Sequence, residues 1–372
     1  MSYYADTVIP MWVERNPQLS DFNLLSKEFG VHAAMRAMTE RPDSPVSAAV
    51  RESVRNRQGS PVKIPVRSKP TIVAGSSRAC SADNNDGVSA LYQPTWQKIS
   101  GSFTVLRHMF ENNYITAMED FDMKMDAIRD AFLTSITTKE LTAIEAYKTA
   151  VMTDSLNYAV SGNTVHSTFK QREMLFGDLF TMMRANKYRG GRMFIIGNGG
   201  IDSTMQHLRQ LGGNNAVDRM QEMNGFDFYF DTAITNAAAV ATVSPAAYGT
   251  CYAIQSGAFA VLFRFSREAN ARERTPMEWW DIIDLPGFGP VEVHHKIGSS
   301  SDQHTRMSAG IDDMTCSIAD SFIFNAEIAI VPAYLANTST MATPVIKADI
   351  WQGSFESMTS LISGATDTPP AS

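Results

Sequence analysis

Apolar residues recur at spacings of three and four through residues 112–152, first as Tyr114, Met118, Phe121, Met125, Ile128 and Phe132. Residues at these spacings share one face of an α-helix, so the pattern predicts an amphipathic helix with one face in the core. The run from Thr134 to Thr138 is rich in β-branched residues and interrupts the pattern. Thr137 and Glu140 have the spacing of a capping box, and the pattern resumes at Leu141. We therefore predict one long kinked helix or two helices end to end.

The other predicted elements are shorter. A helix is predicted over about 168–186, opened by Thr168-x-x-Gln171 as a second capping box, and another over 21–38. Strands are predicted at 226–230, 291–297 and 322–331, and apolar and polar residues alternate in the last two. Helices and strands are segregated along the chain instead of alternating, which is typical of an α+β fold.

Residues 58–106 have the pattern of two extended arms around a polar tip at 76–87. The first arm contains Pro61, Pro65 and Pro70, which cannot donate ladder hydrogen bonds, so it does not belong inside a central sheet. The second arm returns through Trp96 and Ile99. We predict a long protruding hairpin that has little core of its own and needs another surface to lie on.

Charge is distributed unevenly along the chain. Residues 51–80 contain seven basic residues and one acidic residue, so their formal charge is +6. The formal charge of the whole chain is −7, so the other residues together carry −13. A basic arm on an acidic body favours contact between the arm of one copy and the body of another. The alternative is a solvated basic loop. The negative total disfavours a general nucleic-acid binder.

Composition places the chain among folded proteins with a sizeable core. Of 372 residues, 44% are hydrophobic and 19% are charged. No apolar run reaches the length of about 18 residues that a membrane helix needs, and the N-terminus lacks the pattern of a signal peptide, so we expect synthesis in the cytoplasm without export. Cys80, Cys251 and Cys316 are far apart and fit neither a zinc site nor a disulfide framework.

The stretch RMFIIGNGGIDSTMQHL, which begins at Arg192, has the order strand, glycine turn and helix that can hold a pyrophosphate. A dinucleotide fingerprint needs a glycine or small residue where this chain has Asp202. Asp202 is instead suited to cap the helix from within. We therefore interpret the turn at Gly197 as structural and predict no cofactor.

No candidate catalyst or metal site emerges from the remaining motifs. His294 and His295 are neighbours on a predicted strand and point to opposite faces, so they cannot hold one metal together. The chain has no nucleophile elbow, no phosphate loop and no HExxH motif. The stretch 279–290 is interpreted as a loop anchored by burial of Trp279 or Trp280. We predict that the protein is not an enzyme.

The order of elements is N-terminal arm, basic hairpin, long helix, mixed α+β region and closing strand. This order resembles the major capsid proteins of tailed phages, which have the Hong Kong 97-type coat-protein fold that encapsulins share. The resemblance covers nearly the whole chain as architecture. It implies an arm at 1–57, an extended hairpin or E-loop at 58–108 and a peripheral domain with a spine helix at 109–165. It further implies an axial domain at 166–320, a strand returning to the peripheral domain at 321–350 and a C-terminal tail at 351–372.

The function that this resemblance implies is structural. The chain is expected to self-assemble into pentamers and hexamers of an icosahedral virion shell that encloses phage DNA without sequence-specific binding. Scaffolding, portal and decoration proteins are the other partners that the resemblance implies, with no membrane. We expect Arg67, Lys69 and Arg78 of the hairpin to contact other subunits, with Trp96 as an apolar anchor.

Three alternatives remain open on the sequence alone. An encapsulin-like compartment has the same fold but houses a cargo enzyme. A cytoplasmic enzyme would bind a nucleotide at the Gly197 turn, and Asp202 argues against this alternative. A tail or baseplate protein is disfavoured by the long helix.

Overall fold

The computed structural model describes residues 8–15, 46, 48–56, 63–67, 89–106, 117–149, 158–161, 163–186, 188, 193–211, 226–237, 247–275, 277–299, 318–332 and 343–351. The predicted helix at 21–38, the hairpin tip at 76–87, and Cys80 and Cys316 lie outside these residues. So does most of the C-terminal tail.

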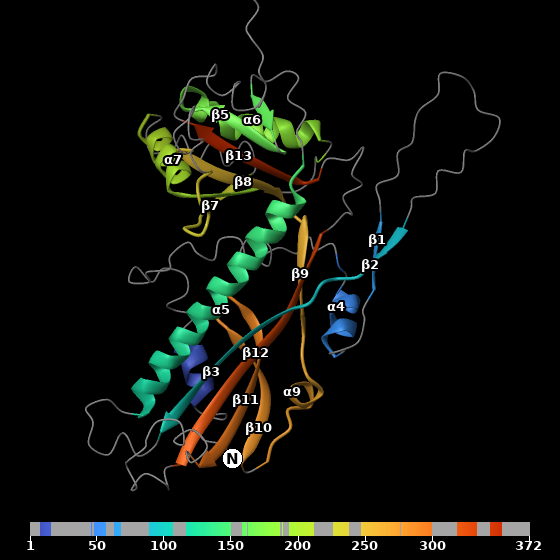
Figure 1. Cartoon of the computed structure of the whole chain (residues 1–372), viewed down its shortest axis with the longest axis vertical. Coiled ribbons are helices and arrows are strands. Elements are labelled where there is room, and N and C mark those ends of the chain that lie inside the picture. Colours follow the sequence, from blue (N-terminus) through green and yellow to red (C-terminus); the bar gives the residue numbers. More distant parts are fainter. Residues whose placement is uncertain are drawn as a thin grey trace, which may run out of the picture.

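A five-stranded antiparallel sheet forms the lower part of the molecule in Figure 1. Its strands run in the order β10 (Glu278–Leu285), β11 (Gly289–Ser299), β12 (Ile318–Pro332) and β3 (Gln97–Leu106). The fifth strand, β9 (Phe259–Arg264), pairs with the C-terminal part of β12. Helix α5 (Ala117–Tyr147) runs along this sheet and continues beyond it (Figure 1).

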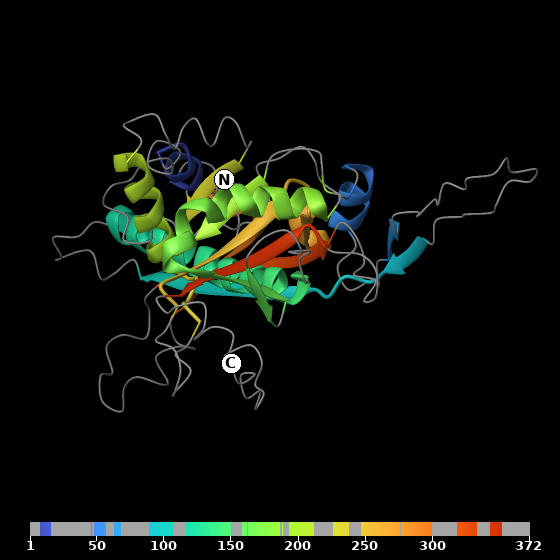
Figure 2. The same cartoon turned by 90° about the horizontal axis from the view of Figure 1, so that it is seen from above.

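A six-stranded sheet forms the upper part of the molecule. Its order is β4 (Ala159–Ser161), β5 (Thr164–Thr168), β13 (Val345–Trp351), β8 (Gly249–Gln255), β6 (Met193–Gly197) and β7 (Phe226–Phe230). The pairs β13–β5 and β6–β7 are parallel, and the others are antiparallel. Helices α6 (Arg172–Ala185) and α7 (Gly199–Leu211) pack on one face of this sheet (Figures 1 and 2). Strands β6 and β8 are buried at every position because both faces are covered.

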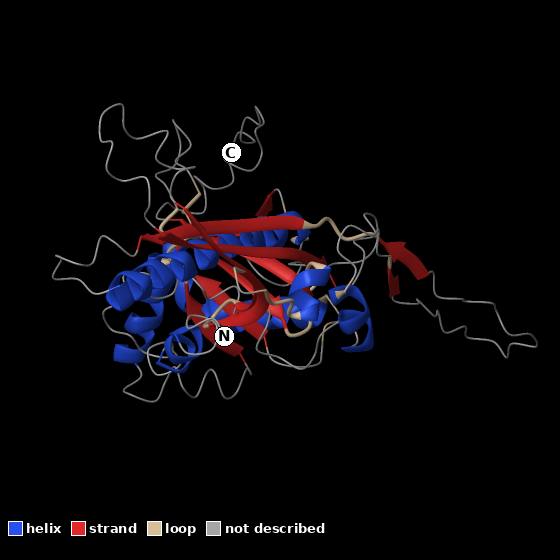
Figure 3. Cartoon of the chain, turned by 90° about the horizontal axis from the view of Figure 1, so that it is seen from below, coloured by secondary structure: helices blue, strands red, loops and turns tan. Residues whose placement is uncertain are grey.

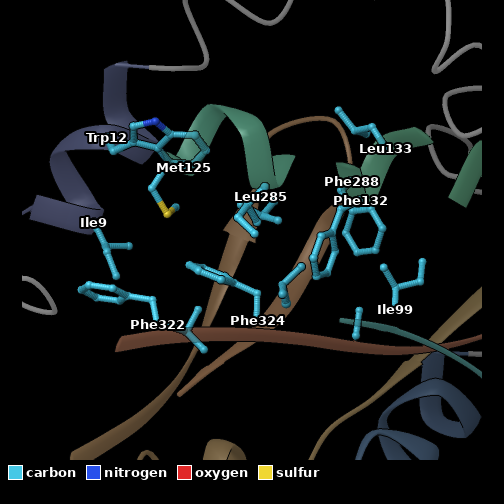
Figure 4. Packing of buried hydrophobic residues seen from close by; sticks show 14 of the residues in the cluster. Ile9, Trp12, Ile99, Met125, Phe132, Leu133, Leu285, Phe288, Phe322 and Phe324 are labelled. Atoms are coloured by element: carbon cyan, nitrogen blue, oxygen red, sulfur yellow. The ribbon is translucent and has the colours of Figure 1, made fainter. Parts of the chain in front are cut away.

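Helix α5 joins the two sheets through two hydrophobic clusters. Its first half packs on the five-stranded sheet, where Phe121 meets Phe103 with 5.6 Å between ring centres. Figure 4 shows Phe132 beside Phe288, and their ring centres are 5.3 Å apart. Its last turns pack on the face of the six-stranded sheet opposite α6 and α7, through Ile144. One helix therefore belongs to both cores and fixes the two sheets relative to each other.

Of the two predicted alternatives, one long helix is confirmed, and an interruption at 134–138 is wrong. Helix α5 is continuous through Thr134–Thr138, and Thr137 and Glu140 lie buried inside it instead of forming a capping box. The hydroxyl of Thr138 donates to the carbonyl of Thr134 at 3.0 Å, within the helix. β-Branched residues lower helix propensity only slightly, and burial of Leu133 and Ile136 outweighs that cost.

Other elements agree with the sequence or refine it. The predicted strands at 226–230, 291–297 and 322–331 are confirmed as β7, β11 and β12. The capping box at Thr168 is confirmed at a 3-10 turn (Phe169–Gln171) that leads into α6. The stretch at 279–290 is not a loop but β10 and its turn into β11, with Trp279 buried as expected. A short helix, α9 (Arg267–Ala271), precedes β10.

The two sheets are interleaved along the chain. Strands β9, β10 and β11 belong to the sheet beside α5, although they lie within the range 166–320. The range 321–350 holds parts of two strands, β12 in the five-stranded sheet and β13 in the six-stranded sheet. The mixed α+β architecture is as predicted, with the chain crossing between the two sheets several times.

Helices α1 and α4 and the strands β1 and β2 lie at the periphery of this body. Helix α1 (Ile9–Arg15) packs on α5 (Figure 4), and the Trp12 indole nitrogen donates to Asp126 at 3.3 Å. Helix α4 (Ala48–Arg55) packs on β9. Strands β1 (Ile64–Arg67) and β2 (Ser89–Tyr92) form a separate antiparallel ribbon. No helix of the described part of the chain is long and apolar enough to cross a membrane.

Candidate inter-subunit surface

The β1–β2 ribbon lies apart from both sheets, at one side of the molecule (Figures 2 and 3). Its pairing places Ile64 opposite Tyr92 and Pro65 opposite Leu91, which confirms that the two arms of the predicted hairpin pair. Ile64 is 3% exposed and packs with Tyr92 against the body, whereas Leu91 is 65% exposed. Successive residues of a strand point to opposite faces, so the ribbon has an inner face on its own body and an outer face that carries Leu91.

Trp96 lies in the segment that joins this ribbon to β3. The guanidinium of Arg264 stacks on the Trp96 ring, 4.1 Å from its centre, and donates to Glu327 at 2.7 Å. The Arg264 and Glu327 side chains are each 8% exposed, so their charges are paired in a largely dry site. Trp96 also packs against the cluster that holds Ile64. These contacts fix where the ribbon leaves the body.

The predicted inter-subunit residues are placed only in part. Arg67 ends β1 and pairs with Ser89 through the backbone. Lys69 and Arg78 lie outside the described residues. Trp96 is half-buried at the base of the ribbon, in contact with its own chain. The inter-subunit roles of all four residues stay predictions.

The outer face of α5 is a second exposed surface among the described residues. Glu119 and Met123 are exposed in its first turns, and Met123 is 65% exposed. Residues 117–130 contain five acidic residues and two basic ones. Asp120 pairs with Lys124 at 2.6 Å. The first half of the helix therefore presents a net acidic surface.

The glycine turn is explained by close packing of the backbone. A Cβ added at Gly200 would lie 1.9 Å from the Tyr248 carbonyl oxygen, so only glycine fits beneath the start of β8. Asn198 exchanges hydrogen bonds with Thr250, through its backbone N–H at 3.2 Å and its side-chain oxygen at 3.1 Å. The strand, turn and helix are as predicted, but the space at the helix N-terminus is occupied by β8. The prediction that Asp202 caps this helix is wrong. The Asp202 N–H donates to the Asn198 carbonyl, and Asn198 holds the cap position.

The two adjacent histidines point to opposite faces, as the sequence predicts. His295 is 1% exposed and lies 3.1 Å from Asp320, whereas His294 stacks on Trp280 with 3.7 Å between ring centres. Within the described ranges, no group of three or more His, Cys, Asp or Glu side chains could hold a metal ion. Cys251 is buried, and burial raises the pKa of its thiol. His295 and Cys251 are therefore part of the packed interior, and His294 packs on Trp280.

Comparison with known proteins gives likeness in structure alone. The chain matches no protein-family model and no curated protein sequence. It is similar to a solved structure from Mycobacterium phage Adephagia, with 11% identity, a TM-score of 0.46, and coverage of 91% of this chain and 97% of that one. It is also similar to the cyanophage A-1(L) capsid asymmetric unit, with 14% identity, a TM-score of 0.45, and coverage of 90% of this chain and 99% of that one. A third similar structure is the capsid of Myoviridae phage XM1, with 11% identity, a TM-score of 0.39, and coverage of 80% of this chain and 88% of that one.

Two features of this surface were missed in the sequence. The pairing of Arg264 with Glu327 joins residues 63 positions apart, and no local pattern marks it. The exposure of Leu91 follows from the register with β1, and strand alternation within Ser89–Tyr92 is too short to indicate it. Both depend on contacts that form only when the chain has folded.

Proposed function

We propose that this protein is the shell subunit of a tailed-phage capsid, a major capsid protein with the Hong Kong 97-type fold. It self-assembles into pentamers and hexamers of an icosahedral shell that encloses DNA. Its activity consists of repeated contacts between copies and involves no catalytic centre. The shell is the part of the virion in which the protein works, after synthesis in the host cytoplasm.

The observation that carries this proposal is the β1–β2 ribbon. A two-stranded ribbon alone is marginally stable in water. This one packs its Ile64 face on its own body and leaves Leu91 65% exposed on the other face. An apolar residue on a projecting ribbon is stabilised when it lies on a second surface, and in a shell that surface belongs to a neighbouring copy.

The body supports this role because long elements run through it. Helix α5 has 31 residues and spans about 47 Å, and β12 has 15 residues and spans about 50 Å. They contribute to one hydrophobic cluster. We propose that α5 with the five-stranded sheet forms the peripheral domain and that the six-stranded sheet forms the axial domain at the capsomer centre.

Charge favours contact between the ribbon and a neighbouring α5. The hairpin region carries Arg67, Lys69 and Arg78, and the first half of α5 presents net negative charge. Opposite charges on two surfaces steer association and fix register more than they add affinity. The acidic body also reduces non-specific adhesion to enclosed DNA, which is densely negative.

The test is direct observation of assembly by the purified full chain in negative-stain electron microscopy. Closed shells, or rings of five and six subunits, are expected. Uniform monomers, even with the proteins of the neighbouring genes supplied, would contradict the proposal. The contents of the shells separate a virion shell from an encapsulin-like compartment, because the first packages DNA and the second houses a cargo enzyme.

A further inference from the structure

Glu140 occupies the point where α5 passes from one hydrophobic core to the other. Ile136 is the last residue of the helix that packs in the core of the five-stranded sheet. Leu141 and Ile144 pack in the core beneath the six-stranded sheet. Glu140 lies between these two sets and is 0% exposed. A carboxyl group is thus buried at the joint between the two parts of the molecule.

This carboxyl group has no compensating donor among the described residues. Neither Glu140 oxygen accepts a hydrogen bond there. The charged group that acts on it is Asp231, which follows β7 and is also 0% exposed. Asp231 is fixed to the six-stranded sheet, because its N–H donates to the Gly197 carbonyl at 2.9 Å and its Oδ1 accepts from Ala233 N–H at 2.8 Å.

Two buried carboxyl groups at one joint do not both ionise without a large cost, because each loses its hydration and they repel each other. Burial, and then the charge of Asp231, raises the pKa of the Glu140 carboxyl well above its usual range. The ionised form of Glu140 becomes favourable when water reaches it. Water reaches it when α5 separates from the six-stranded sheet.

We propose that Glu140 is a protonation-dependent lock between the two sheets of this protein. When the Glu140 carboxyl group is protonated, α5 closes on the six-stranded sheet. When the carboxyl group loses its proton, the joint loosens. The lock lies within a single chain, so it goes beyond the proposed function and does not depend on shell assembly.

A second acidic residue of the same helix has the opposite character and serves as the internal control. Glu145 Oε1 accepts from Lys148 at 2.7 Å and from Lys347 at 3.1 Å, and its Oε2 accepts from Tyr252 at 2.7 Å. Partial burial opposes its ionisation, but these hydrogen bonds outweigh that effect and lower the pKa of Glu145 to about 2. The two lysines at this end of the helix are therefore engaged by Glu145.

The two residues predict opposite pH dependences. The raised pKa of Glu140 means that its contribution to closure is complete below the ordinary pKa of 4.5 and falls as pH rises toward the raised value. Over that interval, the ratio of closed to open molecules falls about tenfold for each pH unit. The lowered pKa of Glu145 means that its contribution is present above 4.5 and is lost as pH falls toward about 2.

The experiment compares the full chain with Glu140→Gln and Glu145→Gln between pH 5 and pH 9. Hydrogen exchange is measured in peptides covering 134–147 and 226–237, each variant against the wild type at the same pH. After correction for the intrinsic pH dependence of exchange, we expect protection in the wild type to fall as pH rises and protection in Glu140→Gln to stay the same at every pH. Glu145→Gln should keep the wild-type pH dependence, with lower protection throughout. Infrared spectra at the acid end of this pH range should show a protonated carboxyl band that Glu140→Gln lacks.

Equal pH dependences in the wild type and Glu140→Gln would overturn the proposal. If Glu140→Gln does not fold, Asp231→Asn provides the second test, because removing the neighbouring charge lowers the pKa of Glu140. The loss of protection should then be complete at a lower pH than in the wild type. An unchanged profile in Asp231→Asn would equally contradict the lock.

Discussion

The guanidinium of Arg264 lies 4.1 Å from the centre of the Trp96 ring and donates to Glu327 at 2.7 Å. Arg264 belongs to β9 and Glu327 to β12, while Trp96 lies between the ribbon and β3. One buried cation thus joins two strands of the body to the segment that leads out to the ribbon. This contact lies beside the apolar cluster through which Ile64 and Tyr92 hold the ribbon on the body.

Replacing Arg264 with leucine should be strongly destabilising. The change leaves Glu327 buried without its cation, which typically costs about 3–5 kcal/mol. Urea unfolding measures the free energy of unfolding of the single variant Arg264→Leu and of the double variant that also carries Glu327→Leu. The double variant should recover most of the loss, because two apolar side chains replace a buried ion pair at little cost. A double variant no more stable than the single one would contradict the importance of the unpaired charge.

Leu91→Asp should block assembly while the subunit stays folded. Leu91 is 65% exposed, so the free energy of unfolding should change by less than about 0.5 kcal/mol. In an assembled shell, however, the carboxylate would be placed in an apolar contact and lose its hydration. Light scattering follows assembly, and Leu91→Met is the matched control that should assemble normally. Normal shells from Leu91→Asp would exclude the outer face of the ribbon as a contact.

Charge reversal at Arg67 and Lys69 tests the electrostatic part of the contact. Glutamates at both positions should repel the acidic surface of a neighbouring α5 and slow assembly at least tenfold. The exchange of Arg67 for lysine and Lys69 for arginine keeps the charge and should assemble at the normal rate. Raising the salt concentration should slow the wild type and narrow the difference, because exposed charges are screened. Assembly of the reversed variant at the wild-type rate would remove these residues from the contact.

The glycine turn offers a matched pair of alanine substitutions. Gly200→Ala places a Cβ 1.9 Å from the Tyr248 carbonyl oxygen and should destabilise the fold by about 1–3 kcal/mol or more. A Cβ at Gly199 meets no atom within 4 Å, so Gly199→Ala should be neutral or slightly stabilising. Thermal unfolding of both variants measures the difference. Equal stabilities would contradict the close approach of β8 to this turn.

The repeating pattern of apolar residues was enough to predict the α+β class, the long helix and the strands β7, β11 and β12. It failed where contacts distant in sequence decide the outcome. Thr137 and Glu140 have the local spacing of a capping box, yet packing on two cores carries the helix straight through them. Strand β10 was missed because Trp279–Leu285 lacks strict alternation and the Pro286–Gly287 turn resembles a loop.

The candidate surface could be predicted only in outline. Prolines and basic residues indicated a projecting hairpin, because such a segment cannot enter a central sheet. The particular residues at its base, Arg264 and Glu327, come from two strands that pair only in the folded chain. Register decides that Leu91 faces outward and Ile64 inward, and register is a property of the paired ribbon.

We propose that this chain builds a closed shell from copies of itself, and electron microscopy of the purified full chain would show such a shell. We expect closed particles, or rings of five and six subunits, in which the ribbon of one copy lies on the α5 helix of the next. Particles of single-subunit size that persist at high concentration and with the neighbouring gene products present would contradict it.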